Sequence, residues 1–597
     1  MPQYPWESSY PPGVSWTPPL PLAPVEDFLA AAAATWPEKT AVDFYGRLLT
    51  YRELSSLAAR AAKGLQALGV GPGVTVGLHL LNTPHHIICF FAVLMAGGRA
   101  ANFNALAPAR DLEHQLADSE SRVLVTLDHP MLNPVVASLE SVDRLPAAVV
   151  VCSLEDFLPA PLAKTLASGG AKRQPGRESA VTFAELIGND GAFRPHPHEP
   201  LYQDIAVLQY TGGTSGDQKA AMLTHANFSA VVGAIRHWTG DLMGHDAVIL
   251  LVLPFFHIFG LAVLLLSVAA GSELVLHLTF DTQRSLADIQ RKRATVYFGV
   301  PTTYAALVQH PAAKKFDLSS LRLCGSGGAP LPAEIFRRFR ELTGLAVLEG
   351  YSLTETTNMG TWQPVGREPR AGSVGLPLPS TLLEIVDLET GMQVLPIGER
   401  GEVCFTGPQI MRGYWKNPEA TAEALRGGRL HTGDIGFMDE HGYVTLVDRK
   451  KDMILCAGQN VFPRRLEKAI CEHPAVAEAA VIGLPDPDLG QIAKAFVVLK
   501  TEHEPLTYGA LRVFLKDKLA GYEIPTAMEI RQILPKTTVG KLAKKNLVAE
   551  ELAKQSLARA VANDGDAAPR LHGNGLSPSL AEARGRQAGA LQRESTD

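Results

Sequence analysis

The chain has 597 residues, of which 46% are apolar and 19% are charged, and its formal net charge is -6 at pH 7. This length exceeds what one hydrophobic core supports, so we expect a globular protein of two or more domains. The chain lacks the basic excess that neutralising nucleic-acid phosphates requires, which argues against a nucleic-acid-binding protein. Six scattered cysteines form no CxxC pair, which predicts a reducing compartment and no zinc site.

Residues 1–24 are rich in proline and predict an extended arm on a domain surface. The arm lacks the basic and apolar regions of a signal peptide. After it, residues 50–53 (TYRE) predict a capping box that opens a helix, which Gly69 ends. A predicted strand at residues 74–80 and a predicted helix at residues 86–95 follow. Strands that alternate with helices imply a mostly parallel sheet.

A glycine-rich loop at residues 210–219 (YTGGTSGDQK) is the most informative stretch of the sequence. It follows a predicted strand at residues 204–209, and residues 222–235 are predicted to start a helix directly after it. Glycines let backbone N–H groups turn inward, and hydroxyls and a lysine add donors and charge, which suits a polyphosphate. The spacing is not that of the P-loop. A flexible linker is the alternative interpretation of the segment alone.

Residues 247–272 form an uncharged apolar stretch that is long enough to span a bilayer. Pro254 and His257 lie inside it, and its first part suits a buried strand, so we expect a strand, a turn and a core helix. A membrane span is the alternative. A lone histidine such as His257 is commonly a core residue with satisfied hydrogen bonds.

Two more loops carry side chains suited to chemistry. In residues 349–357 (EGYSLTETT), Tyr351 can stack on a flat ring, while Thr354 and Glu355 can meet a hard cation. The alternative is a polar loop after a strand. The same segment nearly matches the hydrolase elbow GxSxG around Ser352, with threonine in place of the last glycine. In the glycine-rich turn at residues 321–331, Pro330 breaks the dinucleotide fingerprint GxGxxG.

The C-terminal third adds an acid and a lysine. Asp434, in residues 431–434 (HTGD), can accept hydrogen bonds from the hydroxyls of a sugar, although a surface turn is the commoner use of Gly-Asp. Lys541 follows Gly540 where the last helix is predicted to start, and the helix dipole disfavours a cation there. It either serves an external anion or is a solvated lysine.

The composition changes after Asp448, which predicts a domain boundary. We expect an arm at residues 1–24, a large domain at 25–448, a small domain at 449–556 and a disordered tail at 557–597. The fold class that this predicts is α/β, with βα-layered sheets and a β-rich portion in the large domain and an α+β small domain.

Taken together, these motifs resemble the adenylate-forming superfamily, which includes acyl-CoA synthetases, firefly-type luciferases and adenylation domains of peptide synthetases. The resemblance covers about residues 25–550. It rests on YTGGTSGDQK with MLTH after it, PFFHIFG, GSGGAPL, GYSLTET, HTGD, DRKKDMI and PKTTVGK, in the order of the family. The arm, GVPTTYAAL and the DRKKDMI segment look most like bacterial medium- or long-chain fatty acid CoA ligases.

The resemblance implies a role for each matching residue. The ATP phosphates would be held by Thr211, Gly212, Gly213, Thr214, Ser215, Gly216 and Lys219. The adenine would be bordered by Gly328, Ala329, Pro330, Gly350 and Tyr351, and the ribose bound by Asp434 and Arg449. Thr354 and Glu355 would meet the phosphates and Mg²⁺, with Glu355 as the metal ligand. His257 would lie beside the acyl carboxylate, and Lys541 would reach the carboxylate and the α-phosphate. Lys451 would be the hinge of a mobile small domain. Gly458 would border the entry of CoA. The sequence departs from the usual phosphate loop at Gln218, where proline is common, and at Ala220, where glycine is common.

The activity implied is AMP-forming ligation of a fatty acid to CoA, with ATP and CoA as substrates and Mg²⁺ as cofactor. An acyl tunnel would run beside His257, between residues 299–304 and 325–328. The resemblance further implies a cytoplasmic protein with at most peripheral membrane association, allows a homodimer, and involves no nucleic acid. The alternatives are a CoA ligase for an aryl, short branched or dicarboxylic acid, and a ligase that loads a carrier protein. From other classes, a transporter would use residues 247–272 as a span, and a hydrolase would use Ser352.

Overall fold

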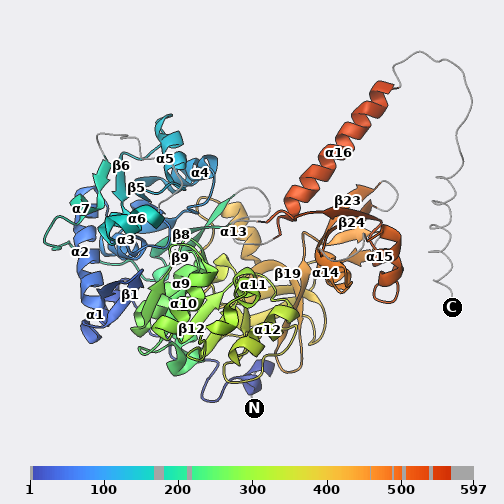
Figure 1. The fold of residues 1–597 in the computed structure, drawn as a ribbon, viewed down its shortest axis with the longest axis horizontal. Coiled ribbons are helices and arrows are strands. Elements are labelled where there is room, and N and C mark those ends of the chain that lie inside the picture. Colours follow the sequence, from blue (N-terminus) through green and yellow to red (C-terminus); the bar gives the residue numbers. More distant parts are fainter. Residues whose placement is uncertain are drawn as a thin grey trace, which may run out of the picture. The chain divides into compact units, whose positions relative to one another are not determined.

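The computed structural model describes residues 4–166, 180–211, 218–456, 459–486, 490–500, 506–536 and 542–565. Contacts divide the chain into two units, residues 1–544 and residues 545–597. Four β-sheets lie in the first unit, and the described part of the second unit is helical. In Figure 1 the cyan strands β5 (Ser121–Leu127) and β6 (Ala148–Cys152) lie in one sheet, whereas the dark blue strand β1 (Thr40–Phe44) joins the green strands of another.

One sheet has seven strands in the order β7-β6-β5-β3-β4-β8-β9. Its strands are β3 (Thr75–His79), β4 (Arg99–Asn102), β5 (Ser121–Leu127), β6 (Ala148–Cys152), β7 (Ala180–Thr182), β8 (Ile205–Thr211) and β9 (Lys219–Thr224). All neighbouring pairs are parallel except β8 with β9. The central strand β3 is buried along its whole length, as expected of a parallel strand covered on both faces.

A second sheet has nine strands in the order β16-β15-β14-β13-β12-β10-β11-β1-β2. Its strands are β1 (Thr40–Phe44), β2 (Arg47–Thr50), β10 (Val248–Leu251), β11 (Glu273–Leu276), β12 (Val296–Gly299), β13 (Leu323–Ser326), β14 (Leu348–Tyr351), β15 (Thr361–Trp362) and β16 (Leu376–Pro377). The six strands from β14 to β1 are parallel, and the edges are antiparallel.

Two smaller sheets follow along the chain. The antiparallel four-stranded sheet contains β17 (Leu382–Val386), β18 (Gly401–Thr406), β19 (Leu430–Met438) and β20 (Val444–Arg449). The last sheet contains β21 (Ile454–Cys456), β22 (Gln459–Val461), β23 (Val476–Asp486), β24 (Gly490–Leu499) and β25 (Ala527–Arg531). This last sheet packs with its own helices around a separate apolar cluster, as expected of a small α+β domain.

The helices connect the strands in the alternation that the sequence predicts. The α-helices of the larger part are α1 (Asp27–Thr35), α2 (Tyr51–Ala67), α3 (Pro84–Met95), α4 (Ala109–Ser119), α5 (Asn133–Glu140), α6 (Ala160–Leu166), α7 (Phe183–Leu186), α8 (His225–Thr239), α9 (Ile258–Ala270), α10 (Thr282–Lys292), α11 (Pro301–Gln309), α12 (Ala333–Thr343) and α13 (Pro418–Ala424). Then follow α14 (Pro463–Cys471), α15 (Tyr508–Leu515) and α16 (Lys544–Gly565). The 3₁₀ turns are η1 (Pro5–Ser9), η2 (Leu154–Asp156), η3 (Gly240–Met243), η4 (Ala313–Lys315), η5 (Thr354–Thr356), η6 (Arg426–Gly428) and η7 (Gly521–Glu523). The α/β fold class is therefore confirmed.

The apolar stretch at residues 247–272 forms β10, a turn and α9, as predicted. Helix α9 has 13 residues, nearly all of them buried, and it packs against α1 and α8. Among the described helices, none combines the length and apolar content that a bilayer crossing requires. The stretch therefore owes its apolar character to burial inside the protein.

The capping box at the start of α2 is confirmed. Thr50 Oγ1 accepts a hydrogen bond from the Glu53 backbone N–H at 3.1 Å, and the Glu53 carboxylate accepts from the Thr50 N–H at 3.3 Å. Such a pair satisfies two backbone donors that the helix itself leaves unpaired.

The prediction that a helix starts at residue 222, directly after the glycine-rich loop, is wrong about where the helix starts. Lys219–Thr224 instead form strand β9, which returns antiparallel to β8, and α8 begins only at His225. Thr224 caps α8, because its hydroxyl oxygen accepts from the Asn227 backbone N–H. The described ends of the phosphate-loop segment thus belong to two paired strands rather than to a strand and a helix.

The proline-rich arm contributes buried side chains to the fold, in addition to lying on the surface. Its Trp6 and Tyr10 side chains are 2% and 4% exposed. The Tyr10 hydroxyl donates to the Pro377 carbonyl at 2.5 Å, and Trp16 Nε1 donates to the Thr381 carbonyl at 3.3 Å. Burying a large aromatic side chain stabilises a fold by about 1.5–3 kcal/mol, so the arm is part of the folded core.

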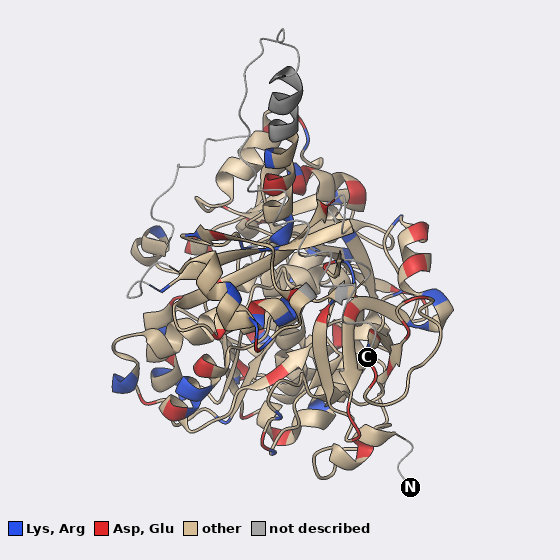
Figure 2. Cartoon of the chain, turned by 90° about the vertical axis from the view of Figure 1, so that its right-hand side faces the viewer, with Lys and Arg blue, Asp and Glu red and all other residues tan. Residues whose placement is uncertain are grey.

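The boundary at Asp448 stays a prediction, because the contact-based division separates only residues 545–597 from the rest. The last helix begins at Lys544 rather than at Gly540, and it continues to Gly565, beyond the predicted end of the small domain at residue 556. Residues 566–597, most of the predicted tail, lie outside the described residues. In the view of Figure 2, basic and acidic residues are interspersed along the ribbon.

A cluster of histidines and carboxylates joins the arm side of the chain to the start of α8. His198 Nδ1 lies 2.8 Å from Asp204 Oδ2, and His198 Nε2 lies 2.9 Å from Glu26 Oε1. His198, Asp204 and His225 are close enough to hold a metal ion. However, both ring nitrogens of His198 face carboxylates, so the imidazolium form satisfies the cluster without a metal. The hydrogen bond to Glu26 outweighs burial and, with Asp204, raises the pKa of His198 to about 9.

This cluster predicts a loss of stability at alkaline pH. The folded pKa of about 9 exceeds the ordinary value of 6.5, so the contribution of His198 is fully present below pH 6.5 and disappears as the pH rises through 9. In the wild type, the free energy of unfolding should decline as the pH rises from 6.5 through 9. We expect His198→Gln to remove the part of this decline that His198 causes, as measured by urea unfolding at several pH values. His441→Gln, at an exposed histidine, is the control and should keep the decline. An equal decline in the His198 variant and the wild type would contradict this assignment.

Candidate functional site

The hairpin β8–β9 places the two ends of the glycine-rich loop side by side. Thr211, the last residue of β8, pairs with Lys219, the first residue of β9, and its hydroxyl donates to the Lys219 carbonyl at 3.3 Å. Residues 212–217, which include the predicted phosphate ligands Gly212, Gly213, Thr214, Ser215 and Gly216, lie outside the described residues. The two described ends of the loop are therefore held next to each other by the strand pairing.

Gln218, where the sequence departs from the usual phosphate loop, is attached to helix α4. Its amide Nε2 donates to Asp111 Oδ2 at 2.9 Å, and its Oε1 accepts from Gln115 Nε2 at 2.6 Å. On the other strand, the Tyr210 hydroxyl donates to Asp118 Oδ2 at 2.7 Å. One helix therefore anchors both sides of the hairpin, and a proline at position 218 could not make these bonds. Ala220 is buried within β9.

Lys219 and Glu355 both contact Tyr414, a residue that the sequence did not indicate as part of the site. The Lys219 ammonium lies 5.3 Å from the centre of the Tyr414 ring, and the Tyr414 hydroxyl donates to Glu355 Oε1 at 2.7 Å. Burial and the Glu355 charge raise the pKa of Tyr414, so its hydroxyl stays a donor. Glu355 lies in the turn η5 together with Thr354. The predicted phosphate lysine and the predicted metal ligand thus share one neighbour.

Tyr351, Asp434 and Arg449 form a second connected group. The Tyr351 hydroxyl donates to Asp434 Oδ2 at 2.6 Å, and Arg449 Nε lies 3.1 Å from Asp434 Oδ1. The strand register places Asp434 of β19 opposite Arg449 of β20. Burial raises the pKa of Tyr351, and the Asp434 charge raises it further. The predicted adenine neighbour and both predicted ribose ligands therefore lie together.

A mostly apolar pocket extends from this group into the core. Its inner wall carries side chains of α8, α9, β12 and β15, among them Ile235, Ala262, Leu266, Phe298 and Trp362. The lining also includes Gly325, Ser326 and Gly327 at the end of β13, and Gly350, Tyr351 and Ser352 at the end of β14. The pocket therefore joins the predicted adenine region to an apolar interior.

One of the two segments predicted to border the acyl tunnel does not line this pocket. Residues 325–327 line the pocket, but residues 299–304 do not. Tyr304 is fully buried, and its hydroxyl donates to the Gly325 carbonyl at 2.9 Å. Helices α8 and α9 contribute to the lining instead, and the course of the acyl tunnel stays a prediction.

His257 caps helix α9. Its Nδ1 accepts a hydrogen bond from the Phe259 backbone N–H at 3.2 Å, and the side chain is half-buried. Phe259, two residues on, lines the pocket. The capping bond fixes Nδ1 as the acceptor, so a proton on the ring would be on Nε2.

The remaining predicted residues are placed as follows. Gly328, Ala329 and Pro330 are exposed in the loop after β13, where Gly328 adopts a positive φ of 85°. Lys451 is the second residue after β20, which ends at Arg449. Gly458 and Lys541, the predicted CoA-entry residue and catalytic lysine, lie outside the described residues.

The hydrolase alternative gains no support from Ser352. Its hydroxyl donates to Asn358 Oδ1 at 3.0 Å. Within the described ranges no histidine forms a hydrogen bond with Ser352, so the activated nucleophile of a serine hydrolase is not formed there.

Comparisons with protein families match most of the chain. Residues 29–415 match the model of the AMP-binding enzyme family, and residues 465–541 match that of the AMP-binding enzyme C-terminal domain. The long-chain-fatty-acid–CoA ligase of Bacillus subtilis (strain 168) is 38% identical over 557 residues, which are 92% of this chain and 98% of that protein. The feruloyl-CoA synthase of an Amycolatopsis species is 35% identical, covering 85% of this chain and 95% of that protein.

Solved structures also match most of the chain. The ATP-bound form of MatB from Rhodopseudomonas palustris is 30% identical, with a TM-score of 0.77 over 88% of this chain and 99% of that one. The anthranilate CoA ligase AuaEII, in complex with anthranoyl-AMP, is 28% identical, with a TM-score of 0.78 over 91% of this chain and 99% of that one.

The hydrogen bond between Tyr414 and Glu355 predicts a measurable contribution to stability. We expect Tyr414→Phe to lower the free energy of unfolding by about 1–2 kcal/mol, because a charge-assisted hydrogen bond is lost. Urea unfolding measures this, and a double-mutant cycle with Glu355→Gln isolates the pair. Tyr202→Phe, at an exposed tyrosine, should have almost no effect. A coupling free energy of zero in the cycle would show that the bond contributes nothing.

Proposed function

Because this chain belongs to the AMP-binding enzyme family, we propose that it is an AMP-forming ligase that joins a medium- or long-chain fatty acid to CoA. The observation that carries the proposal is the 38% identity, over nearly the whole of both chains, with the Bacillus subtilis long-chain-fatty-acid–CoA ligase. The connected groups around Lys219 and Asp434, with an apolar pocket beside them, support it.

The reaction has two steps. In the first, a carboxylate oxygen attacks the α-phosphorus of ATP, the bond to pyrophosphate breaks, and acyl-AMP forms. In the second, the thiolate of CoA attacks the acyl carbon and AMP leaves with the electron pair of the broken bond. Neither step needs a protein nucleophile, so positioning and charge stabilisation carry the catalysis.

The nucleotide would bind along the two connected groups. Lys219 and the loop after Thr211 would hold the phosphates, with Gly212, Gly213, Thr214, Ser215 and Gly216 as further ligands. Asp434 and Arg449 would bind the ribose, and Tyr351 with Gly350, Gly328, Ala329 and Pro330 would border the adenine. The bond from Tyr351 to Asp434 supports this assignment, because it fixes the carboxylate that would accept the ribose hydroxyls.

We propose Mg²⁺ as the cofactor, with Glu355 as its ligand beside Thr354. A carboxylate oxygen is the ligand type that Mg²⁺ prefers, and the half-buried Glu355 is bonded to Tyr414, whose ring lies beside Lys219. When bound with ATP, the ion would neutralise charge on the phosphates. Tyr414 would orient the carboxylate by its hydrogen bond.

The second step requires a different set of residues near the acyl carbon. We propose that the small domain turns about Lys451, so that Lys541 serves acyl-AMP formation and Gly458 borders the thiol entry in the thioester step. His257 would lie beside the acyl carboxylate at the start of α9, and the acyl chain would enter the pocket between α8 and α9.

An aromatic acid is the alternative substrate, favoured by the similarity to a feruloyl-CoA synthase and to an anthranilate CoA ligase. The apolar side chains of the inner wall suit either a chain or a ring. Two alternatives for the reaction stay predictions: transfer to a carrier protein instead of CoA, and a short branched or dicarboxylic acid as substrate. Peripheral membrane association and a homodimer also stay predictions. A cytoplasmic location is also proposed, because all six cysteines are free thiols.

The function is tested by the products that the purified protein makes from ATP, CoA and a panel of acids. We expect AMP and pyrophosphate, with the highest kcat/KM for fatty acids of medium or long chain. Acid-dependent exchange of pyrophosphate into ATP should fall on the order of 100-fold in Lys541→Ala, because charge stabilisation is lost. Lys545→Ala, at an exposed lysine nearby in the sequence, is the matched control. Production of ADP and orthophosphate would contradict the proposal, and a preference for aromatic acids would favour the alternative.

The pocket predicts which residue sets the chain length. Ala262 of α9 lines the pocket and is 2% exposed, so Ala262→Phe should fill it. We expect kcat/KM for hexadecanoate to fall about tenfold relative to octanoate, because the longer chain loses its space. Ala262→Val should give a smaller shift in the same direction, and the KM for ATP should not change. An unchanged ratio in Ala262→Phe would place the acyl chain elsewhere.

A further inference from the structure

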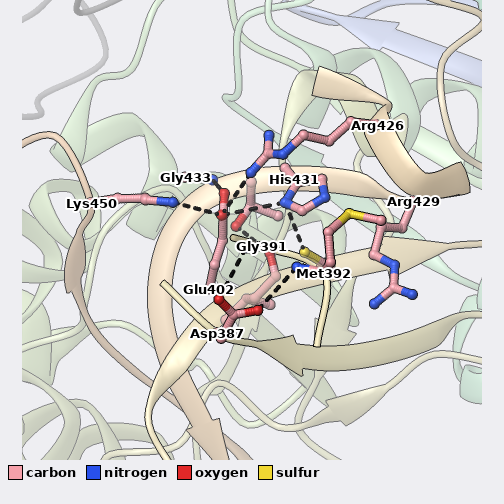
Figure 3. Close-up of polar contacts among 12 residues, drawn as sticks. Asp387, Gly391, Met392, Glu402, Arg426, Arg429, His431, Gly433 and Lys450 are labelled. Atoms are coloured by element: carbon pink, nitrogen blue, oxygen red, sulfur yellow. Dashed lines mark hydrogen bonds and ion pairs between the residues drawn. The ribbon is translucent and has the colours of Figure 1, made fainter. Parts of the chain in front are cut away.

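Glu402 is a buried acid that no step of the proposed reaction uses. It lies on β18 and is 2% exposed. Figure 3 shows its side chain between Lys450 on one side and Arg426 with His431 on the other. A carboxylate in such a place must be paired, because burying an unpaired charge costs several kcal/mol.

Each oxygen of Glu402 has its own partners. Oε1 accepts from the Gly433 backbone N–H at 3.0 Å. Oε2 lies 3.2 Å from Arg426 Nη2, 3.3 Å from Lys450 Nζ and 3.3 Å from His431 Nδ1. Burial alone would raise the pKa of Glu402, but Lys450, His431 and the Gly433 N–H outweigh it and lower the pKa. Glu402 is therefore an anion that organises the groups around it.

A turn of the neighbouring loop makes room for these partners. The Asp387 carboxylate accepts backbone N–H groups of Met392 and Gln393 at 3.0 and 2.8 Å, which closes the turn that contains Gly391 (Figure 3). A Cβ atom at Gly391 would lie 2.9 Å from Arg426 Nη2 and 3.2 Å from the His431 ring. Glycine at this position thus lets the arginine and the histidine reach Glu402.

The segments that Glu402 joins are those of the proposed ribose ligands and hinge. Gly433 immediately precedes Asp434, and Lys450 stands between Arg449 and Lys451. The Lys450 backbone N–H also donates to the Gly433 carbonyl at 2.8 Å. The Lys450 backbone therefore bonds directly to Gly433 of β19, and its side chain is linked to the same residue through Glu402.

We propose that Glu402 and Lys450 are positioning residues that anchor the stationary side of the hinge, so that the small domain turns at Lys451 alone. This inference rests on the proposed function, because it assumes two steps separated by a domain rotation. Without the anchor, the bending would extend into residues 449–450. During the rotation into the thioester step, that would move Arg449 away from Asp434 and misplace the arriving small domain. Acyl-AMP formation precedes the rotation, so both ribose ligands would be in place for it.

The chain offers a matched pair of variants for the test. Arg426 and Lys450 contact the same oxygen of Glu402 at 3.2 and 3.3 Å, and their side chains are 33% and 35% exposed. Arg426 lies in η6, away from the hinge strand in the sequence, whereas Lys450 adjoins the hinge. Lys450→Met and Arg426→Met therefore each remove one cation from Glu402, and only the first releases the hinge segment.

The experiment measures each step in a single turnover. Full-length protein is mixed with ATP, Mg²⁺ and an accepted acid to give the rate of acyl-AMP formation, and CoA is then added to give the rate of its consumption. We expect Lys450→Met to slow the CoA step about five- to tenfold, while acyl-AMP formation stays within about twofold of wild type. We expect Arg426→Met to leave the ratio of the two rates unchanged. In a Glu402→Gln background, Lys450→Met should have no additional effect on the ratio.

Two results would overturn the inference. One is a CoA step at the wild-type rate in Lys450→Met. The other is an equal slowing in Arg426→Met, which would mean that any lost cation near Glu402 has this effect. Urea unfolding of both variants checks that their stability is comparable. Failure of the proposed function would be seen separately, since the wild-type protein would then form no acyl-AMP with any acid.

Discussion

The direction of the parallel strands is the constraint on which the candidate site depends. Side chains at the carboxyl ends of parallel strands meet at one edge of a sheet. Thr211 ends β8, Ser326 ends β13 and Tyr351 ends β14. Tyr351 and Ser326 line the same pocket, and His257 caps the helix that follows β10. Strand direction thus brings together the loops after β10, β13 and β14 of the nine-stranded sheet. Thr211 comes from β8 of the seven-stranded sheet, and the antiparallel pair β19–β20 adds Asp434 and Arg449.

Much of this arrangement could be predicted from sequence, because local patterns specify it. The capping box at Thr50 and the strand and helix within residues 247–272 depend on neighbours within a few residues. Strand β9 was not predicted, since its six residues lead straight into the capped helix α8 and share its apolar pattern. The motifs also placed Tyr351 with Asp434, but only through a family resemblance. No short sequence pattern predicts a contact between two residues that are 83 positions apart.

The features of the site that could not be predicted from the sequence are long-range contacts between side chains. Tyr414 lies 59 positions from Glu355, and nothing in its own segment indicates that its hydroxyl reaches that carboxylate. Tyr304 is a second example, because its hydroxyl donates to the Gly325 carbonyl 21 positions away, and nothing in its own segment indicates this partner. The anchoring of Gln218 to α4 across more than 100 positions is a further example.

The N-terminal arm has a consequence for how the protein is handled. Trp6 packs so closely on Gly442 that a Cβ atom there would lie 2.5 Å from the tryptophan, and Gly442 makes the turn between β19 and β20. The strand pair that carries Asp434 and Arg449 is thus braced by the first few residues of the chain. A protease cut or a short deletion before residue 16 would remove that brace, so an affinity tag belongs at the other terminus.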